Sequence, residues 1–335
     1  MNPGKVSQSI LKRSVLKCID QSREEVAVDP AAGEDCAVLR LEDGNDLLFA
    51  VSKTAPYPSQ MGKYAVTSVV NKIAAQGGVC IGILVHAIFP SRTRELHIKN
   101  AMEELESAAA AHHLAVVGGH TELSETVAEP VISLTGIGKA ARGTYIRTAA
   151  AEAGKDVVMT KWIGLEGTAI LAREGKEELL TRLPEAFIEE AKSFESLLSV
   201  AAEAATAVKS GVCAMHAVSE GGIFGALWEL ADCAGVGLSI DLKNIPVRQE
   251  TIEISEFYHI NPYELLSGGS LLLVADHGYE LVERLLEEHI PAAVIGRTTD
   301  GNDRVIRSRD EFRFLEPPKM DEIYKVTFRK EKSKK

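Results

Sequence analysis

Short acidic, glycine-rich and lysine-bearing segments give this sequence its candidate chemistry. The first is Gly33-Glu34-Asp35, where two acids follow a flexible glycine at the end of a loop. Adjacent carboxylates can hold a divalent cation against phosphates, because Mg²⁺ prefers oxygen ligands. Asp35 is the acid that we expect to contact a metal. A turn that is merely acidic explains the same residues, and on spacing alone it is the more frequent case.

A second segment, Gly118-Gly119-His120-Thr121-Glu122, comes directly after the apolar run 114–117. Residues that follow a strand lie where α/β folds usually bind ligands. We expect the glycine N–H groups to face a ligand, His120 to bind an anion or transfer a proton, and Glu122 to accept a proton or hold a metal. A tight turn with solvated polar side chains is an equally good interpretation.

The third segment, residues 215–222, has the pattern of a strand, a polar turn, two glycines and a helix. Amides at a helix N-terminus carry partial positive charge and suit an anionic group. Glycines at a helix start are also common for packing reasons, so this signal is weak alone, as is the similar turn at 164–168. The candidate ligand contacts in this segment are His216, Ser219, Glu220, Gly221 and Gly222.

Three lysines complete the set. Lys72 lies in the mostly apolar stretch 62–76, which predicts a buried helix. A lysine on such a helix must find an anion or extend to solvent, because burying an unpaired charge is costly. Lys53 and Lys161 each follow a predicted strand. A fixed ammonium in a pocket can neutralise phosphate without a metal, whereas a Lys72 that reaches solvent would have no such role.

The elements that must position these residues alternate between strand and helix. The pattern predicts strands at 36–41, 47–51, 79–89, 114–117, 131–138, 157–160, 212–215, 237–241, 270–275 and 292–297. It predicts helices at 7–19, 62–76, 95–113, 185–207, 223–233 and 279–289. Asp43-Gly44-Asn45 predicts a hairpin turn. The Ala- and Gly-rich stretch 142–155 predicts a boundary between two units, and the basic end 329–335 predicts a disordered tail.

Composition excludes several classes of function. A chain of 335 residues with 45% hydrophobic and 25% charged side chains suffices for two domains. Its net charge of −11 disfavours a nucleic-acid binder, and no apolar run reaches the roughly 18 residues that a membrane span needs. Five cysteines without a CxxC pair predict a reduced, cytoplasmic protein. No GxGxxG follows a first strand, which excludes a dinucleotide dehydrogenase.

Taken in order, these segments resemble the aminoimidazole ribonucleotide (AIR) synthetase superfamily. Its members include the hydrogenase-maturation carbamoyl dehydratase, thiamine-monophosphate kinase and selenophosphate synthetase. The resemblance extends over roughly residues 4–325 and is nearest to the dehydratase-like branch, often labelled AIR synthase-related. The stretches that carry it are 33–39, 70–74, 116–122 and 216–222. No single stretch is decisive, but four in register are fairly specific.

The resemblance implies a two-domain fold, with an N-terminal α/β domain at 1–148 and a C-terminal α+β domain at 149–328. Two chains would pair through N-terminal strands that join into a barrel, giving a homodimer. ATP would bind in the interdomain cleft, where family members phosphorylate an amide or acid oxygen and acidic residues hold Mg²⁺. Besides the third segment and the two lysines, the expected ligand contacts are Gly33, Glu34, Asp35, Asn71, Gly118 and Gly119.

The sequence departs from the family pattern in one chemical direction. Lys53, Lys72 and Ala217 stand where family members commonly carry Asp. Two acids replaced by two lysines change the local charge by about +4, and each close pair of cations repels by about 4 kcal/mol at an effective dielectric near 20. We therefore expect a metal-poor site in which the two lysines face the phosphates. The acids that remain from the family set are Asp35, Glu122 and Glu34.

Two functions follow as hypotheses. The chain is either an ATP- or phosphate-handling enzyme, with Lys72, His120 and Glu122 as catalytic residues, or a catalytically inactive dimer that binds a nucleotide or metabolite as a sensor or assembly partner. The dehydratase modifies a Cys at its own C-terminus. This sequence ends in Ser333-Lys334-Lys335 and its last cysteine is Cys233, so hydrogenase maturation by that route is not expected. The reactive N-terminal Cys or selenocysteine motif of selenophosphate synthetase is not found either.

Overall fold

The computed structural model describes residues 8–16, 24–28, 31–40, 44–53, 60–309, 311–317 and 319–326, apart from the side chains of Ser14 and Lys53. The predicted tail 329–335 and Asp43 of the predicted hairpin turn lie outside the described residues. At the start of the chain, α1 (Gln8–Ile10) continues into the π-helix η1 (Leu11–Val15), within the predicted helix 7–19.

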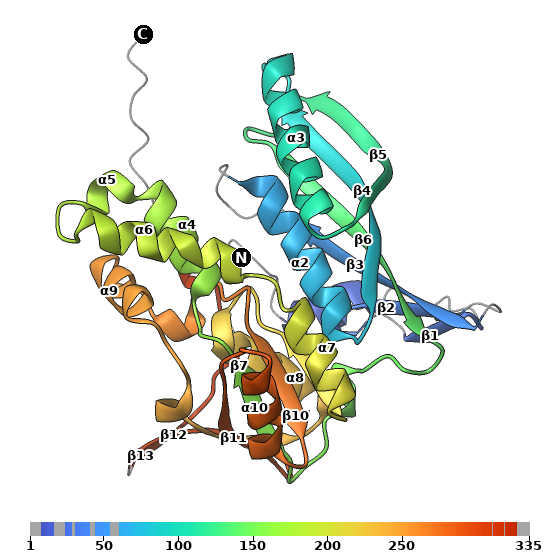
Figure 1. The fold of residues 1–335 in the computed structure, drawn as a ribbon, viewed down its shortest axis with the longest axis vertical. Helices are drawn as coiled ribbons and strands as arrows, with labels where there is room; N and C mark the ends of the chain where they lie inside the picture. The colour runs from blue at the N-terminus through green and yellow to red at the C-terminus, as the bar shows by residue number, and fades with distance from the viewer. Residues whose placement is uncertain are drawn as a thin grey trace.

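The first domain is built on a mixed sheet that, in the described residues, has six strands in the order β1-β2-β3-β6-β4-β5. Neighbouring strands are antiparallel except for the parallel pair β4–β5. The strands are β1 (Val26–Val28), β2 (Ala37–Arg40), β3 (Asn45–Lys53), β4 (Val79–Pro90), β5 (Ala115–Ser124) and β6 (Val131–Ala141). The helices α2 (Met61–Ala75) and α3 (Glu95–Ala111) cover one face of this sheet (Figure 1).

Buried and exposed side chains alternate along β4, which shows that the helices cover only one face of the sheet. Ile83, Val85 and Phe89 are buried beneath α2 and α3, whereas Leu84 and His86 between them are exposed. In a strand, successive side chains point to opposite faces, so the second row of β4 lies on the uncovered side. Burial of α2 around most of its circumference confirms the prediction for 62–76.

The predicted turn at 118–122 is wrong, because these residues continue β5. The strand pairs with β4 in parallel as far as Ser124, opposite Pro90. Gly119 lies so close to β4 that a Cβ there would be 2.0 Å from the carbonyl oxygen of Val85. The glycine pair is therefore a place where two strands approach closely, a pattern that a short sequence cannot distinguish from a turn.

The second domain has, among its described residues, a seven-stranded sheet in the order β13-β12-β9-β11-β7-β10-β8. The strands are β7 (Asp156–Thr160), β8 (Ala214–Ala217), β9 (Gly237–Asp241), β10 (Leu271–Ala275), β11 (Ala292–Thr299), β12 (Arg304–Ser308) and β13 (Glu311–Phe314). The main helices are α4 (Leu165–Glu174), α5 (Lys176–Leu179), α6 (Glu185–Ser193), α7 (Ala201–Lys209), α8 (Gly222–Ala234), α9 (Gln249–Phe257) and α10 (Gly278–Glu287). The shorter 3₁₀ turns are η3 (Thr148–Ala150), η4 (Phe194–Leu197), η5 (Leu242–Asn244), η6 (Pro262–Glu264) and η7 (Glu322–Lys325).

The central strands of this sheet are buried on both faces. In β10, Leu272 packs in a core cluster with residues of α8, whereas Leu273 packs in a second cluster with residues of α10. Continuous apolar strands of this kind are expected where helices cover both sides of a sheet. The observed layers confirm the predicted fold class, an α/β domain followed by an α+β domain.

The predicted helix 185–207 is wrong in its middle. The chain forms α6, then the 3₁₀ turn η4, and begins α7 only at Ala201. Side chains from elsewhere in the molecule bind the polar backbone groups of residues 197–200, as described below, and so stabilise a non-helical path. Helix α9 and strands β12 and β13 were also not predicted from the sequence pattern.

Candidate functional site

Helix α2 lies between the first sheet and the second domain, beside α7 (Figure 1). Asn71, buried on this helix, donates from Nδ2 to the carbonyl oxygen of Leu198 at 2.7 Å, and its Oδ1 accepts the N–H of Val200 at 2.9 Å. Both polar atoms of the predicted ligand contact Asn71 therefore bind the backbone of the second domain. This residue fixes the loop that follows η4.

The same loop is held from the other side by Lys161. Its Nζ donates to the carbonyl oxygens of Leu197 and Ser199, at 2.7 and 2.6 Å, and forms an ion pair with Glu203 at 2.6 Å. Burial lowers the pKa of Lys161, and the carboxylate of Glu203 opposes this effect. Because its donors are engaged in this way, Lys161 acts as a structural lysine of the second domain.

Lys72 lies next to Asn71 and faces a narrow pocket between the domains. Its Nζ donates to the carbonyl oxygen of Val51 at 2.7 Å, near the end of β3 and two residues before Lys53. The pocket has a volume of about 20 Å³, roughly that of one water molecule. It is lined by Tyr64, Thr67, Ser68, Asn71, Lys72, Glu166, Leu198, Ala217, Val218, Ser219 and Gly268.

A histidine between two carboxylates forms a second interdomain contact. His216, at the end of β8 and buried, has its Nδ1 3.1 Å from Oδ2 of Asp35 and its Nε2 3.2 Å from Oε2 of Glu229. Burial alone would lower the pKa of His216, but Asp35 and Glu229 outweigh this effect and raise it to about 10. The N–H of Ala217 also donates to Asp35, at 3.1 Å. A protonated His216 thus joins Asp35 of the first domain to α8 of the second.

Glu34 is engaged in the same way. Its Oε1 is 3.0 Å from Nε of Arg147, and its Oε2 accepts from Nε2 of Gln76 at 3.2 Å. Gly33 has φ of +92°, and a Cβ there would be 2.8 Å from the carbonyl oxygen of Glu229. Gly33-Glu34-Asp35 therefore packs against α8 as an interdomain contact.

These contacts determine whether Glu34 and Asp35 could hold the Mg²⁺ that the family resemblance implies. The carboxylates of Glu34 and Asp35 already accept from protein donors. Within the described residues, no group of three or more His, Cys, Asp or Glu side chains has the arrangement of a metal site. A magnesium ion usually needs one or two carboxylates with open oxygens beside the substrate phosphates. The donor set described here does not fit a resident Mg²⁺.

The start of α8 is built from two glycines with positive φ, Gly221 at +91° and Gly222 at +63°. A Cβ on Gly222 would be 2.5 Å from the carbonyl oxygen of Tyr263, so only glycine fits. The N–H of Gly221 donates to Oδ2 of Asp321 at 2.6 Å. A carboxylate of the chain itself thus binds the amide that the sequence suggested for an anionic ligand.

Half-buried Glu166, in the first turn of α4, is a pocket residue that the sequence interpretation did not single out. Burial, together with the charge of Asp321, raises the pKa of Glu166 to about 8, so it is largely protonated at pH 7. Burial also raises the pKa of Asp321 to about 6, and Glu220 contributes to both shifts. The turn at 164–168 was noticed as glycine-rich, but nothing in its spacing indicated that it would face α2.

His120 and Glu122 lie on the edge strand β5, outside the interdomain pocket. Their side chains are exposed and contact each other, with Nε2 3.3 Å from Oε2. The register places His120 opposite His86, His86 opposite Ser133, and Ser133 opposite Lys53. This row separates His120 from the Lys53 backbone by three strand spacings, roughly 14 Å. Gly118 and Gly119 belong to the same edge.

Comparison with known families and proteins gives a consistent result. The family model described as AIR synthase related protein, N-terminal domain, matches residues 33–140. The model described as AIR synthase related protein, C-terminal domain, matches residues 152–308. Together the two models match most of the chain, in the order in which the two sheets occur.

Individual relatives are distant but extend over nearly the whole chain. A putative hydrogenase expression/formation protein of Methanocaldococcus jannaschii is 25% identical over 313 residues, 90% of each chain. Carbamoyl dehydratase HypE of Rhizobium leguminosarum is 24% identical, covering 84% of this chain and 81% of its own. Among solved structures, the HypE–HypF complex matches with a TM-score of 0.72, 21% identity and coverage of 87% and 97%. HypE in complex with ATP matches with a TM-score of 0.70, 17% identity and coverage of 96% and 97%.

Proposed function

Because the chain belongs to the family of AIR synthase related proteins, we propose that it binds ATP, or a similar phosphate-bearing ligand, between its two domains. The proposed reaction transfers the terminal phosphoryl group to an amide or acid oxygen of a small acceptor. The ATP-bound HypE that shares this fold supports the choice of nucleotide. The residues facing the interdomain pocket supply hydroxyl, amide and ammonium donors, which suit an anion.

The observation that carries this proposal is the position of Lys72. Its ammonium lies 2.7 Å from the carbonyl oxygen of Val51, beside the segment that ends in Lys53, and the same side chain lines the pocket. A phosphate entering the pocket would offer Lys72 a charged acceptor in place of a neutral carbonyl. Charge-assisted hydrogen bonds are roughly twice as strong as neutral ones, so the exchange favours the ligand.

In this proposal the chain's own lysines neutralise the phosphate charge, which a bound metal ion does in other phosphoryl-transfer enzymes. Catalysis of phosphoryl transfer depends mainly on positioning and on neutralising the phosphate charge. Lys72, with Lys53, would bind the phosphate oxygens, and Ser68, Thr67 and Ser219 would orient them through hydroxyl groups. His120 and Glu122 of one chain lie outside this pocket, so we assign them no direct role in it.

We also propose that the protein is a homodimer, paired through the uncovered face of the first sheet. Val51 on β3 and Leu84 on β4 are 59% and 41% exposed, and both pair with Thr135 of β6, so they share one row. Further exposed apolar side chains of this sheet are Val79 and Ile81 on β4, Val117 on β5 and Val131 on β6. Exposed apolar patches of this kind mark interaction surfaces.

Calorimetric titration with ATP, in the presence of Mg²⁺ and in the presence of EDTA, tests the proposal. We expect Kd to change less than threefold on chelation, and Lys72→Ala to weaken binding at least tenfold, which is about 1.4 kcal/mol. Lys99→Ala, on the exposed side of α3, is the matched control and should bind as the parent does. Binding that requires Mg²⁺, or that ignores Lys72, would refute the proposal.

A second candidate function is a catalytically inactive dimer that binds a nucleotide or metabolite as a sensor or assembly partner. The lysines at the positions where the family resemblance places acids favour it. An assay for ADP release with candidate amide and acid acceptors separates the two. Turnover that Lys72→Ala abolishes supports the enzyme, and tight ATP binding without turnover supports the inactive dimer.

A further inference from the structure

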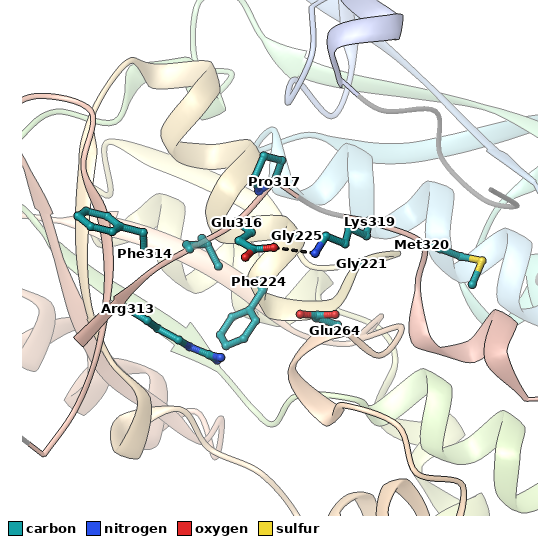
Figure 2. A pocket seen from close by; sticks show the side chains of 11 residues that line it. Gly221, Phe224, Gly225, Glu264, Arg313, Phe314, Glu316, Pro317, Lys319 and Met320 are labelled. Atoms are coloured by element: carbon teal, nitrogen blue, oxygen red, sulfur yellow. Dashed lines mark hydrogen bonds and ion pairs between the residues drawn. The ribbon is translucent and has the colours of Figure 1, made fainter. Parts of the chain in front are cut away.

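A larger cavity, of about 460 Å³, lies in the second domain beside the start of α8 (Figure 2). It is separate from the interdomain pocket and lies on the other side of a short turn. Ser219 lines the interdomain pocket, whereas Gly221 lines this cavity. Its volume is in the range of small-molecule sites. Of the segments that suggested the function, the third reaches this cavity through Gly221.

Phe224 and Arg313 form part of one cavity wall, and Tyr263 supports Phe224 by stacking on it. The ring of Phe224, on the first turn of α8, stacks on Tyr263 with centroids 5.2 Å apart and planes within 12°. The guanidinium of Arg313, from β13, lies 5.2 Å from the centroid of the same ring. A cation held over an aromatic face keeps its N–H groups free at the edge. The stack therefore presents a preoriented donor for an anion.

The charges around the cavity differ in how they are engaged. Glu316 and Lys319, both on the outer wall and both exposed, pair with each other at 2.6 Å (Figure 2). Arg313 and Glu264 have no ion pair within 4.0 Å among the described residues, although both line the cavity. One cation and one carboxylate are thus available to a ligand. Phe314, Pro317 and Met320 add apolar surface.

The outer wall of the cavity, residues 313–317 and 319–320, is held in place at both ends. Leu315 is buried, and its N–H donates to the carbonyl oxygen of Arg304 at 2.7 Å. At the other end Asp321 accepts the N–H groups of Gly221, Leu266 and Ile323, at 2.6, 3.2 and 2.9 Å. Since the same carboxylate fixes the outer wall and the start of α8, the cavity is formed before any ligand enters.

We propose that this cavity binds a small planar molecule that carries both an anionic group and an N–H donor. Arg313 binds the anionic group, Glu264 accepts the N–H, and the planar body lies against the apolar wall.

The experiment uses 4-aminobenzoate as probe, since it has a carboxylate, an amine and a flat ring. Binding to the full chain is followed by NMR titration, with benzoate and aniline as probes that each lack one polar group. We expect saturable binding of 4-aminobenzoate in the millimolar range, and at least fivefold weaker binding of the other two. Equal binding of all three probes would overturn the proposal, as would a failure to saturate by about 20 mM.

Substitutions at residues that line the cavity test whether the probe binds there. Arg313→Gln and Glu264→Gln should each weaken 4-aminobenzoate at least fivefold and leave ATP binding unchanged. Lys209→Gln, at an exposed position on α7 away from the cavity, is the control and should change probe binding less than twofold. Thermal unfolding confirms that each variant folds. Probe binding that is indifferent to Arg313→Gln would refute the assignment, as would displacement of the probe by ATP.

The outcomes separate this inference from the proposed function. If ATP fails to bind while 4-aminobenzoate depends on Arg313 and Glu264, the cavity remains a ligand site and the phosphoryl-transfer function falls. If ATP binds through Lys72 but no probe enters the cavity, the proposed function stands and the assignment of the cavity as a ligand site is overturned.

Discussion

Nδ1 of His216 lies 3.1 Å from the carboxylate of Asp35, although the two residues belong to different domains and are 181 positions apart in the sequence. Both side chains are almost completely buried, and Glu229 contacts the other ring nitrogen at 3.2 Å. The arrangement joins the loop before β2 to α8. Its physical consequence is that this interdomain contact depends on the charge of one histidine.

Replacement of His216 by Gln is expected to destabilise the protein by about 3 kcal/mol. The change leaves two buried carboxylates without their cation, and breaking a buried ion pair from one side costs about this much. Urea unfolding followed by circular dichroism measures the difference. His97→Gln, on the exposed side of α3, is the control and should shift stability by less than about 0.5 kcal/mol. Equal stability of the two variants would contradict the structural role of His216.

The same histidine predicts a dependence of stability on pH. Its pKa is raised from 6.5 to about 10 in the folded protein, so the folded state holds the proton more tightly than the unfolded state. Its contribution is complete below pH 6.5 and is lost as the pH rises from 6.5 towards 10. We expect the free energy of unfolding to fall across this window, and His216→Gln to flatten the fall. A wild-type profile that is flat or rising there would rule this out.

The two ends of α8 provide a matched pair of glycine substitutions. Gly222 and Gly235 have similar positive φ, +63° and +69°, but a Cβ would be 2.5 Å from the Tyr263 carbonyl at the first and meets nothing within 4 Å at the second. Gly235→Ala should cost about 1 kcal/mol for the backbone conformation alone. Gly222→Ala should cost about 3 kcal/mol because the backbone must also move. Chemical denaturation measures the loss of stability in both variants. Equal losses would show that the structure around Gly222 relaxes to accommodate the Cβ.

How far the sequence predicts this molecule depends on whether the signal is local. The strands around Ile83 and Leu272, the helix around Lys72 and the strand–glycine–helix pattern at 215–222 have hydrophobic periodicity or turn residues of their own, and all were predicted. The break at 194–200 was not, because Asn71 and Lys161, 129 and 39 residues from Val200, supply its hydrogen bonds. No spacing rule connects residues so far apart.

The candidate site was predicted in part for the same reason. Asn71, Lys72 and Ser219 belong to recognisable segments, and they line one pocket. Glu34 and Asp35 were noticed as acids, but the sequence does not reveal that Arg147 and His216 bind them. His120 was expected in a turn, and only the pairing of Gly119 with Val85 shows that it belongs to an edge strand. Lys53 stays a prediction, since its side chain lies outside the described part of the structure.

The uncovered sheet face predicts how the oligomer responds to charge. Leu84→Glu places a carboxylate in the apolar row that includes Val51, where pairing with a second copy would bury it at a cost of several kcal/mol. We expect this variant to be monomeric by light scattering at concentrations where the parent is a dimer. Leu96→Glu changes a leucine on α3 that is even more exposed, 62% against 41% for Leu84, over the covered face, and should leave the mass unchanged. A Leu84→Glu variant that still pairs would place the interface elsewhere.

The role of the lysines predicts that metal dependence can be restored. The double variant Lys53→Asp/Lys72→Asp lowers the charge near the pocket by about 4, which removes repulsion of about 4 kcal/mol per close pair and adds carboxylate oxygens for a cation. We expect ATP to bind this variant at least tenfold more tightly with Mg²⁺ than with EDTA, whereas the parent differs by less than threefold. Lys99→Asp/Lys209→Asp makes the same change in net charge at exposed positions and should behave as the parent does. If both double variants respond to Mg²⁺ alike, net charge alone governs the effect and the two lysines do not stand in for a metal.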